Sequence, residues 1–143
     1  MTQEDKKLLL KDLCARLPHK VIVNISASGP DTYDNYIPSI NDAVLTAIDL
    51  NTEKCKFKEF YWDKYIVDVR PYLRPMSSMT EEERNEYLDV KMQECERVAL
   101  AEVYRPEAIS IVLDWLNSHH FDYRGLIEKG LALEAPMDMY KTE

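Results

Sequence analysis

AVLTAIDLNTEKCKFKEFY, residues 43–61, is the stretch that decides the fold class of this chain. Its two ends, 43–50 and 54–61, are rich in β-branched, apolar and aromatic residues, as strands are. The polar residues 51–53 between them are typical of a turn. The stretch therefore predicts a hairpin of two antiparallel strands.

Two further strands are predicted on either side of this hairpin. Residues 20–26, KVIVNIS, place Val21, Val23 and Ile25 on one face, because side chains alternate along a strand. Residues 65–69, YIVDV, form a fourth extended stretch that ends before Pro71.

A helix is predicted before the strands, over residues 3–17. Thr2 is a suitable N-cap, and Asp5 lies three residues on, as in a capping box. Pro18 ends the helix. The expected apolar stripe consists of Leu10, Leu13, Cys14 and Leu17.

A second helix is predicted after the strands. Prolines at 71 and 75 make 71–79 a connector. Thr80 and Glu83 then form a capping box that begins a helix running to about residue 102. The expected buried stripe of this helix consists of Leu88, Met92, Cys95 and Ala99.

The last third of the chain predicts one more long helix and a shorter one. Pro106 suits the first position of a helix that ends near residue 118. Asp122 would cap a last short helix with Gly130 at its end, followed by an extended segment and a frayed C-terminus. The apolar stripe of the long helix consists of Ile109, Val112, Leu113 and Leu116, and it is wide enough to predict packing on two sides.

The order helix, strands, helices predicts an α+β fold with a small antiparallel sheet of three or four strands. A small SH3-like barrel is an alternative arrangement of the same strands. No repeat, low-complexity tract or linker divides the chain. We therefore expect a single domain, 1–143, with a helix and the strands in 1–75 and helices in 76–143.

Composition excludes several classes of protein. Apolar residues make up 45% and charged residues 31% of the 143 positions, which is typical of a globular chain. The formal net charge of −8 argues against a nucleic-acid binder. No apolar run has the ~20 residues that span a bilayer, and the N-terminus lacks the apolar core of a signal peptide. We expect no membrane association and a cytoplasmic protein.

The cysteines agree with a reducing compartment. Cys14, Cys55 and Cys95 are an odd number and are widely separated, which suits neither a disulfide framework nor a zinc site. Each lies on an apolar stripe, so all three are predicted to be buried free thiols.

Three blocks of sequence are familiar: LLLKDLCARLP (8–18), PYLRPMSSMTEEE (71–83) and DWLNSHHFDYRGLIEKGLALEAP (114–136). With them the chain resembles a family of small uncharacterised proteins from gut anaerobes and their phages or mobile elements. The blocks cover about a third of the chain. The resemblance implies a shared architecture and brings no activity with it.

The densest group of functional side chains is His119, His120, Asp122 and Arg124. In a small enzyme, one histidine would be a general base, Asp122 would orient it and Arg124 would bind an anion. The structural alternative fits adjacent residues on a turn better: a histidine closes the preceding helix and Asp122 caps the next.

Cofactor and metal motifs are absent from the sequence. The three glycines, Gly29, Gly125 and Gly130, form no phosphate-binding loop. No HExxH, CxxC or His-x-His spacing is present. We expect neither a cofactor nor a metal.

Two surfaces are candidates for binding. Lysines that alternate along one strand, with aromatic residues close by, are typical of a single-strand nucleic-acid site, although they also protect strand edges. The helix after Thr80 carries an acidic outer face that could dock on a basic partner or be an ordinary solvated face. The first surface consists of Lys54, Lys56, Lys58, Phe60 and Trp62, and the second of Glu82, Glu86, Asp89, Gln93 and Glu96.

The sequence thus favours a non-enzymatic interaction or regulatory protein of a phage or mobile element, with another protein as its partner. The alternatives are a small enzyme at the histidine block and a binder of single-stranded nucleic acid. Nothing in the sequence sets the oligomeric state.

Overall fold

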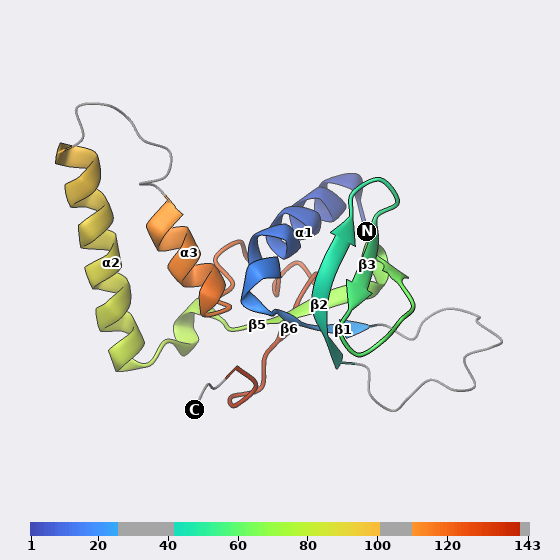
Figure 1. The fold of residues 1–143 in the computed structure, drawn as a ribbon. Coiled ribbons are helices and arrows are strands. Elements are labelled where there is room, and N and C mark those ends of the chain that lie inside the picture. Colours follow the sequence, from blue (N-terminus) through green and yellow to red (C-terminus); the bar gives the residue numbers. More distant parts are fainter. Residues whose placement is uncertain (26–41, 101–109, 141–143) are drawn as a thin grey trace.

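The computed structural model shows an α+β fold, as the sequence predicts (Figure 1). It describes residues 1–25, 42–100 and 110–140. The helices are α1 (Gln3–Arg16), α2 (Glu81–Leu100) and α3 (Ser110–Ser118), and the strands are β1 (Ile22–Ile25), β2 (Asp42–Asp49), β3 (Lys54–Phe57), β4 (Lys64–Tyr65), β5 (Val69–Leu73) and β6 (Leu133–Glu134). Short 3-10 turns follow at η1 (Leu17–His19), η3 (Ile66–Asp68) and η4 (Met76–Ser78).

The strands form one open, mixed sheet in the order β4-β3-β2-β1-β5-β6. Neighbours are antiparallel except β5 and β6, which are parallel. Because β4 and β6 are separate edges, the sheet is not a closed barrel, and it is larger and less uniform than the small antiparallel sheet expected. The two edge strands have only two residues each, which is too short for alternation to be seen in a sequence.

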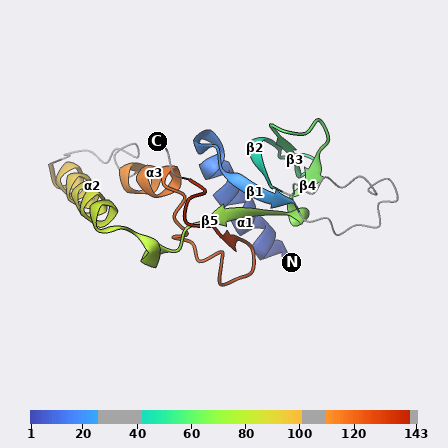
Figure 2. The same cartoon turned by 90° about the horizontal axis from the view of Figure 1, so that it is seen from below.

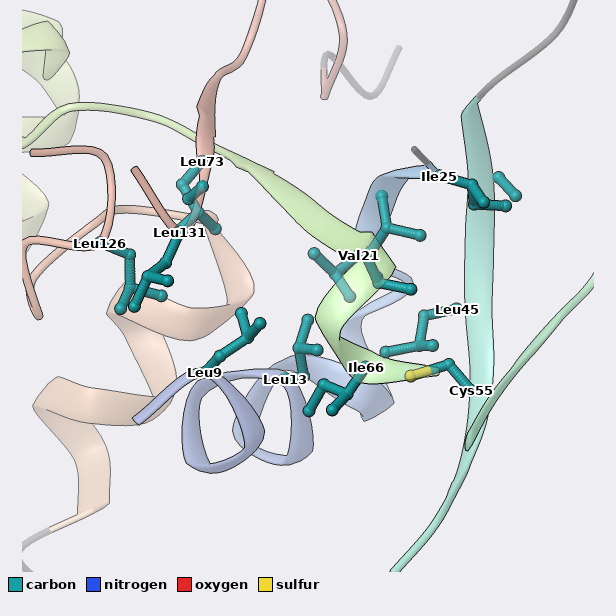
Figure 3. Packing of buried hydrophobic residues seen from close by; sticks show 14 of the residues in the cluster. Leu9, Leu13, Val21, Ile25, Leu45, Cys55, Ile66, Leu73, Leu126 and Leu131 are labelled. Atoms are coloured by element: carbon teal, nitrogen blue, oxygen red, sulfur yellow. The ribbon is translucent and has the colours of Figure 1, made fainter. Parts of the chain in front are cut away.

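The core lies between one face of the sheet and α1. Val21, Val23 and Ile25 all point into it, which confirms their predicted common face. Figure 3 shows Leu9 and Leu13 of α1 projecting toward the side of the sheet where Val21 lies. Each fully buried leucine contributes about 2 kcal/mol through the removal of apolar surface from water. The same cluster includes Leu126, Leu131 and Ala132, so the C-terminal segment packs on the first part of the chain.

Helix α1 begins as predicted but buries a different face. The Asp5 amide donates to Thr2 Oγ1 at 3.0 Å and the Thr2 amide to the Asp5 carboxylate at 3.3 Å, which confirms the capping box. The fully buried residues are Leu9, Asp12, Leu13 and Arg16, whereas Leu10 and Leu17 are only partly buried. The buried face differs from the predicted one because Asp12 and Arg16 pair with each other in the interior. A prediction from apolar residues alone places such charged residues in solvent.

The prediction of three buried thiols was wrong for two of them. Cys55 on β3 is buried, and this burial raises its pKa to about 12. Cys14 and Cys95 are exposed. Cys14 lies at the solvent edge of a stripe in which only Leu13 is fully buried, and the stripe that holds Cys95 does not face the core.

The predicted strand 65–69 is mostly the 3-10 turn η3, and β5 begins at Val69 and continues through Pro71, before which the sequence predicted an end. Pro71 lies opposite Val23 of β1, and on the other side β6 pairs only with Tyr72 and Leu73. The β6 side of Pro71 is therefore free of ladder pairing among the described strands, and a strand tolerates proline at such a position. The predicted connector 71–79 thus starts as a strand and includes η4.

Helix α2 begins at the predicted capping box, with the Glu83 amide 3.1 Å from Thr80 Oγ1. Its predicted buried stripe is wrong, because Leu88 is 51% exposed, Met92 is 63% exposed and Cys95 is exposed. The helix lies beside α3 and away from the sheet in both views (Figures 1 and 2). The side chain of Ala99 lies outside the described residues.

Helix α3 lies between α2 and the core. Tyr87 of α2 stacks on Trp115 with ring centroids 5.5 Å apart, and the next residue along α3, Leu116, is buried. Leu113 is 41% exposed, so packing does not extend over the whole predicted stripe. Pro106 and Ile109 lie outside the described residues.

The C-terminal segment folds back onto the sheet. The residues after Asp122 form turns instead of the predicted short helix, and Gly130 ends them with a φ of 73°. The extended segment that follows contains β6, as the sequence predicts. Tyr140 is held by hydrogen bonds, so the fraying predicted from residue 137 does not include it.

No helix among the described residues is both long and apolar enough to cross a membrane.

Candidate functional site

The histidine block 119–124 is joined to the end of β5 by backbone hydrogen bonds. The Arg74 amide donates to the His120 carbonyl at 2.7 Å, and the Asp122 amide donates to the Arg74 carbonyl at 2.8 Å. Arg74 and Phe121 thus form a parallel bridge. The Arg74 guanidinium lies 4.3 Å from the centre of the Phe121 ring and pairs with Glu83 of α2. The block is therefore placed where the sheet meets the helical pair.

His119 closes helix α3. Its Nδ1 lies 2.8 Å from the Trp115 carbonyl oxygen, one turn earlier, and its ring stacks on the Trp115 ring at 4.1 Å. The same carbonyl also accepts from the His119 amide at 3.1 Å and from the Ser118 hydroxyl at 2.9 Å, so the imidazole adds a further contact to the last turn of the helix. This contact is the structural role that the sequence offered as an alternative to catalysis.

His120 lies in the interior with a left-handed backbone, at a φ of 62°. Its ring stacks on Tyr140 with centroids 3.7 Å apart, and its Nδ1 has no hydrogen-bond partner among the described residues. Burial, helped by the positive charge of Arg16, lowers the pKa of His120 to about 3. The ring is therefore neutral at physiological pH and its environment opposes protonation.

Asp122 and Arg124 have separate partners. The Asp122 carboxylate accepts from the amides of Leu126 at 2.8 Å and Ile127 at 3.0 Å, so it caps a turn. Arg124 Nη1 donates to the carboxylate of Asp12 on α1 at 2.7 Å. Because each of the four candidate side chains makes a different contact, they hold segments together instead of facing one reaction centre. The geometry gives the enzymatic hypothesis no support.

Asp12 and Arg16 belong to the same region, and sequence reasoning missed them. Arg16 Nε donates to Asp12 at 2.8 Å, and its Nη2 donates to the Phe121 carbonyl at 2.5 Å. Both side chains are fully buried, and Arg124 is the second partner of the Asp12 carboxylate. The four-residue spacing of an acid and a base on one helix was the signal that could have found the pair.

The lysine strand agrees with its prediction only in part. Lys56 and Lys58 are exposed on the face opposite Cys55 and Phe57, as alternation requires. Phe60 and Trp62 stack on each other at 4.5 Å and pack against the core, so these rings are not free to stack on bases. Lys54 lies over the Tyr65 ring, with its nitrogen 5.2 Å from the ring centre.

A more accessible aromatic residue, Tyr61, lies between Phe60 and Trp62 in the sequence. Tyr61 is 98% exposed, and Tyr65 is also exposed. Alternation within a strand carries no information about which aromatic side chain of the following loop is exposed.

The outer face of α2 is acidic as predicted, and it borders an apolar stripe. Glu82, Glu86, Asp89 and Gln93 are all exposed, whereas the side chain of Glu96 lies outside the described residues. Beside them on the helix lie Asn85, Leu88, Met92 and Cys95, all exposed, which we call the α2 stripe. Helical geometry places this stripe away from Tyr87, which stacks on Trp115 of α3.

The described part of the chain contains no group of three or more His, Cys, Asp or Glu side chains placed to hold a metal ion.

Comparisons with family models, with curated proteins and with solved structures found no match to this chain.

Proposed function

We propose that this protein acts by binding a protein partner through the exposed surface of α2, as an accessory or regulatory factor. The observation that carries this proposal is the exposure of Leu88 and Met92 on a regular helix that contributes nothing to the core cluster among the described residues. Leucine and methionine side chains gathered on one helix face mark interaction sites, because they lose unfavourable contact with water when a partner covers them. The link to a phage or mobile element rests on the sequence resemblance alone.

The position of α2 supports the same proposal. Its inner face rests on α3 through Tyr87, and the Arg74–Glu83 pair fastens its first turn with distances of 2.7 and 2.6 Å. These contacts fix the helix without using the α2 stripe. A partner would therefore meet a preformed helix, which reduces the conformational entropy lost on binding.

Capture from the native host tests this proposal. Tagged wild-type protein is compared with Leu88→Lys, and Leu50→Lys serves as the control because Leu50 is 64% exposed in the turn after β2. We expect a stoichiometric partner with the wild type and the control, and its loss with Leu88→Lys, because a lysine in a covered apolar contact leaves a desolvated charge. The same set of captured proteins from all three baits by mass spectrometry, with the untagged native copy of this chain counted as a partner, would contradict the proposal.

A second candidate function is the binding of single-stranded nucleic acid next to β3. It is favoured by the almost complete exposure of Tyr61, close in sequence to Lys56 and Lys58. An accessible ring can stack on a base while nearby lysines contact phosphates. The pairing of Lys56 with Asp63 at 3.7 Å reduces the positive charge available there.

Fluorescence anisotropy with a labelled single-stranded oligonucleotide tests this second function. If Tyr61 stacks on a base, Tyr61→Ala should weaken binding by about 1–3 kcal/mol, and affinity should fall steeply with salt because counterions are released from phosphates. Met137→Ala is the control, since Met137 is exposed elsewhere. Absence of binding at low salt would end this hypothesis.

A further inference from the structure

The α2 stripe has the spacing of a coiled-coil seam. Asn85, Leu88, Met92 and Cys95 follow one another at intervals of three, four and three residues. This alternation has a mean period of 3.5 residues, which keeps one line of side chains facing a partner helix along a left-handed supercoil. In heptad notation Asn85 and Met92 take the a positions, and Leu88 and Cys95 take the d positions.

The charges beside the stripe differ on its two sides. Arg84 and Lys91 occupy the g positions, and Glu82 and Asp89 occupy the e positions, and all four side chains are exposed. Lys91 also lies 4.8 Å from the centre of the Tyr87 ring. One flank of the stripe is therefore basic and the other acidic, which is a pattern that can select an orientation.

Charge complementarity distinguishes the two ways in which a second copy could pack. In a parallel pair related by a two-fold axis along the helices, each g position faces the e position five residues later on the partner. Arg84 then meets Asp89 of the other copy on both sides of the seam. In an antiparallel pair g faces g and e faces e, which brings like charges together and costs free energy.

The polar residue of the stripe favours the same arrangement. Asn85 is at an a position, where an asparagine pairs with its counterpart in a parallel, in-register dimer and disfavours other registers. In the rest of the fold α3 covers only the opposite side of α2, so the two molecular bodies would lie on opposite sides of the seam (Figures 1 and 2). Nothing among the described residues blocks the α2 stripe.

We propose that the partner of the α2 stripe is a second copy of this chain, bound as a parallel, in-register two-helix seam with reciprocal Arg84–Asp89 pairs. This inference rests on the proposed function of α2 as an interaction surface and names its occupant. It places the two Cys95 side chains opposite each other at a d position. The seam is short, so the dimer is weak and concentration-dependent.

Charge reversal tests the proposal by analytical ultracentrifugation over a range of concentrations. Arg84→Glu and Asp89→Arg should each raise the dimer dissociation constant by about tenfold, because two attractive pairs become repulsive. An equimolar mixture of the two variants should restore dimers, since each glutamate or aspartate again faces an arginine. Both side chains are exposed, so neither change disturbs the fold of one chain.

Thiol cross-linking gives the second measurement. In a Cys14→Ser background, a short bis-maleimide should join Cys95 to Cys95 in the wild-type sequence and much less in Arg84→Glu. Removal of Cys14 is needed because that thiol is also exposed. Cross-linking that is equal in both proteins would reflect random collision and count against the seam.

The result that overturns the proposal is a chain that stays monomeric up to about 1 mM, or dimers that do not respond to the charge reversals. If the chain is monomeric and Leu88→Lys still abolishes capture of a different protein, α2 binds another partner and the proposed function stands. If neither self-association nor capture depends on Leu88, both proposals fail.

Discussion

His120 is a histidine kept neutral in the protein interior. In the unfolded chain its pKa is about 6.5, whereas the folded structure lowers its pKa to about 3. At pH values between these two pKa values, His120 is protonated in the unfolded chain and neutral in the folded chain. Stability from the neutral ring is therefore complete above pH 6.5 and is lost as pH falls toward 3.

We predict that the free energy of unfolding falls by about 2 kcal/mol between pH 7 and pH 5 because of this residue. His120→Asn should remove most of this pH dependence, and asparagine tolerates the left-handed backbone at φ 62°. The measurement is urea unfolding at both pH values. Glu83 does not interfere, because its pKa, lowered to about 2 by the hydrogen bond from Arg74, keeps it ionised in the folded state there.

An equal pH dependence in the wild type and His120→Asn would contradict this prediction. His119→Asn is the matched control, because His119 lies at the surface end of α3 and only partly buried. The change in unfolding free energy between pH 7 and pH 5 is then compared among the wild type and the two variants.

At the scale of elements, Tyr140 bridges β1 and β5 just beyond the end of their paired region. Its hydroxyl accepts from the Ile22 amide at 3.0 Å and lies 2.8 Å from the Tyr72 carbonyl, to which it donates. The paired region of β1 and β5 begins at the next residues, Val23 and Pro71. The hydroxyl therefore replaces a direct backbone pair at the end of this ladder, and desolvation raises the pKa of Tyr140.

Tyr140→Phe should lower the free energy of unfolding by about 1–3 kcal/mol, because it leaves the Ile22 amide without its partner. The measurement is chemical denaturation at pH 7. Tyr61→Phe is the control, since the exposed Tyr61 side chain should lose its hydroxyl without measurable effect. Equal stability of the two variants would show that solvent serves Ile22 as well as Tyr140 does.

Local features of the elements were predictable, and long-range ones were not. The capping boxes at Thr2 and Thr80 were predicted correctly because each depends on residues three positions apart. Leu88, Met92 and Cys95 of the α2 stripe were recognised as members of one face but wrongly assigned to the core. A period in the sequence shows that one face is apolar, and it does not show whether the chain itself supplies the cover.

In the candidate site, too, the local contacts could be predicted from the sequence and the long-range contacts could not. The roles of His119 and Asp122 as helix-closing and turn-capping residues followed from adjacent sequence. The partner of Arg124, Asp12, is separated from it by 112 residues, and no local pattern could connect them. Parallel pairing of β5 with β6 was hidden for the same reason, since β6 has only two residues.

At the scale of the whole molecule, stability is unevenly distributed. The core cluster draws on α1, the sheet and residues 126–132, and among the described residues α2 adds nothing to it. Helix α2 is held by α3 and by the Arg74–Glu83 pair. An element with so little buried apolar surface opens locally at lower free energy than the core does.

Amide hydrogen exchange should therefore be at least about tenfold faster in α2 than in β1 and β2 in dilute solution. A dimer that forms through α2 adds about 2.7 kcal/mol of protection when the concentration is a hundred times its dissociation constant. Exchange in α2 should then slow with concentration, while exchange in β1 stays constant. Leu88→Lys should abolish the concentration effect alone, because Leu88 is exposed in a single chain. If the amides of α2 are as protected from exchange as those of β1 at every concentration, the contacts of α2 with α3 alone stabilise the helix. That result would contradict a dimer that protects α2 through its stripe.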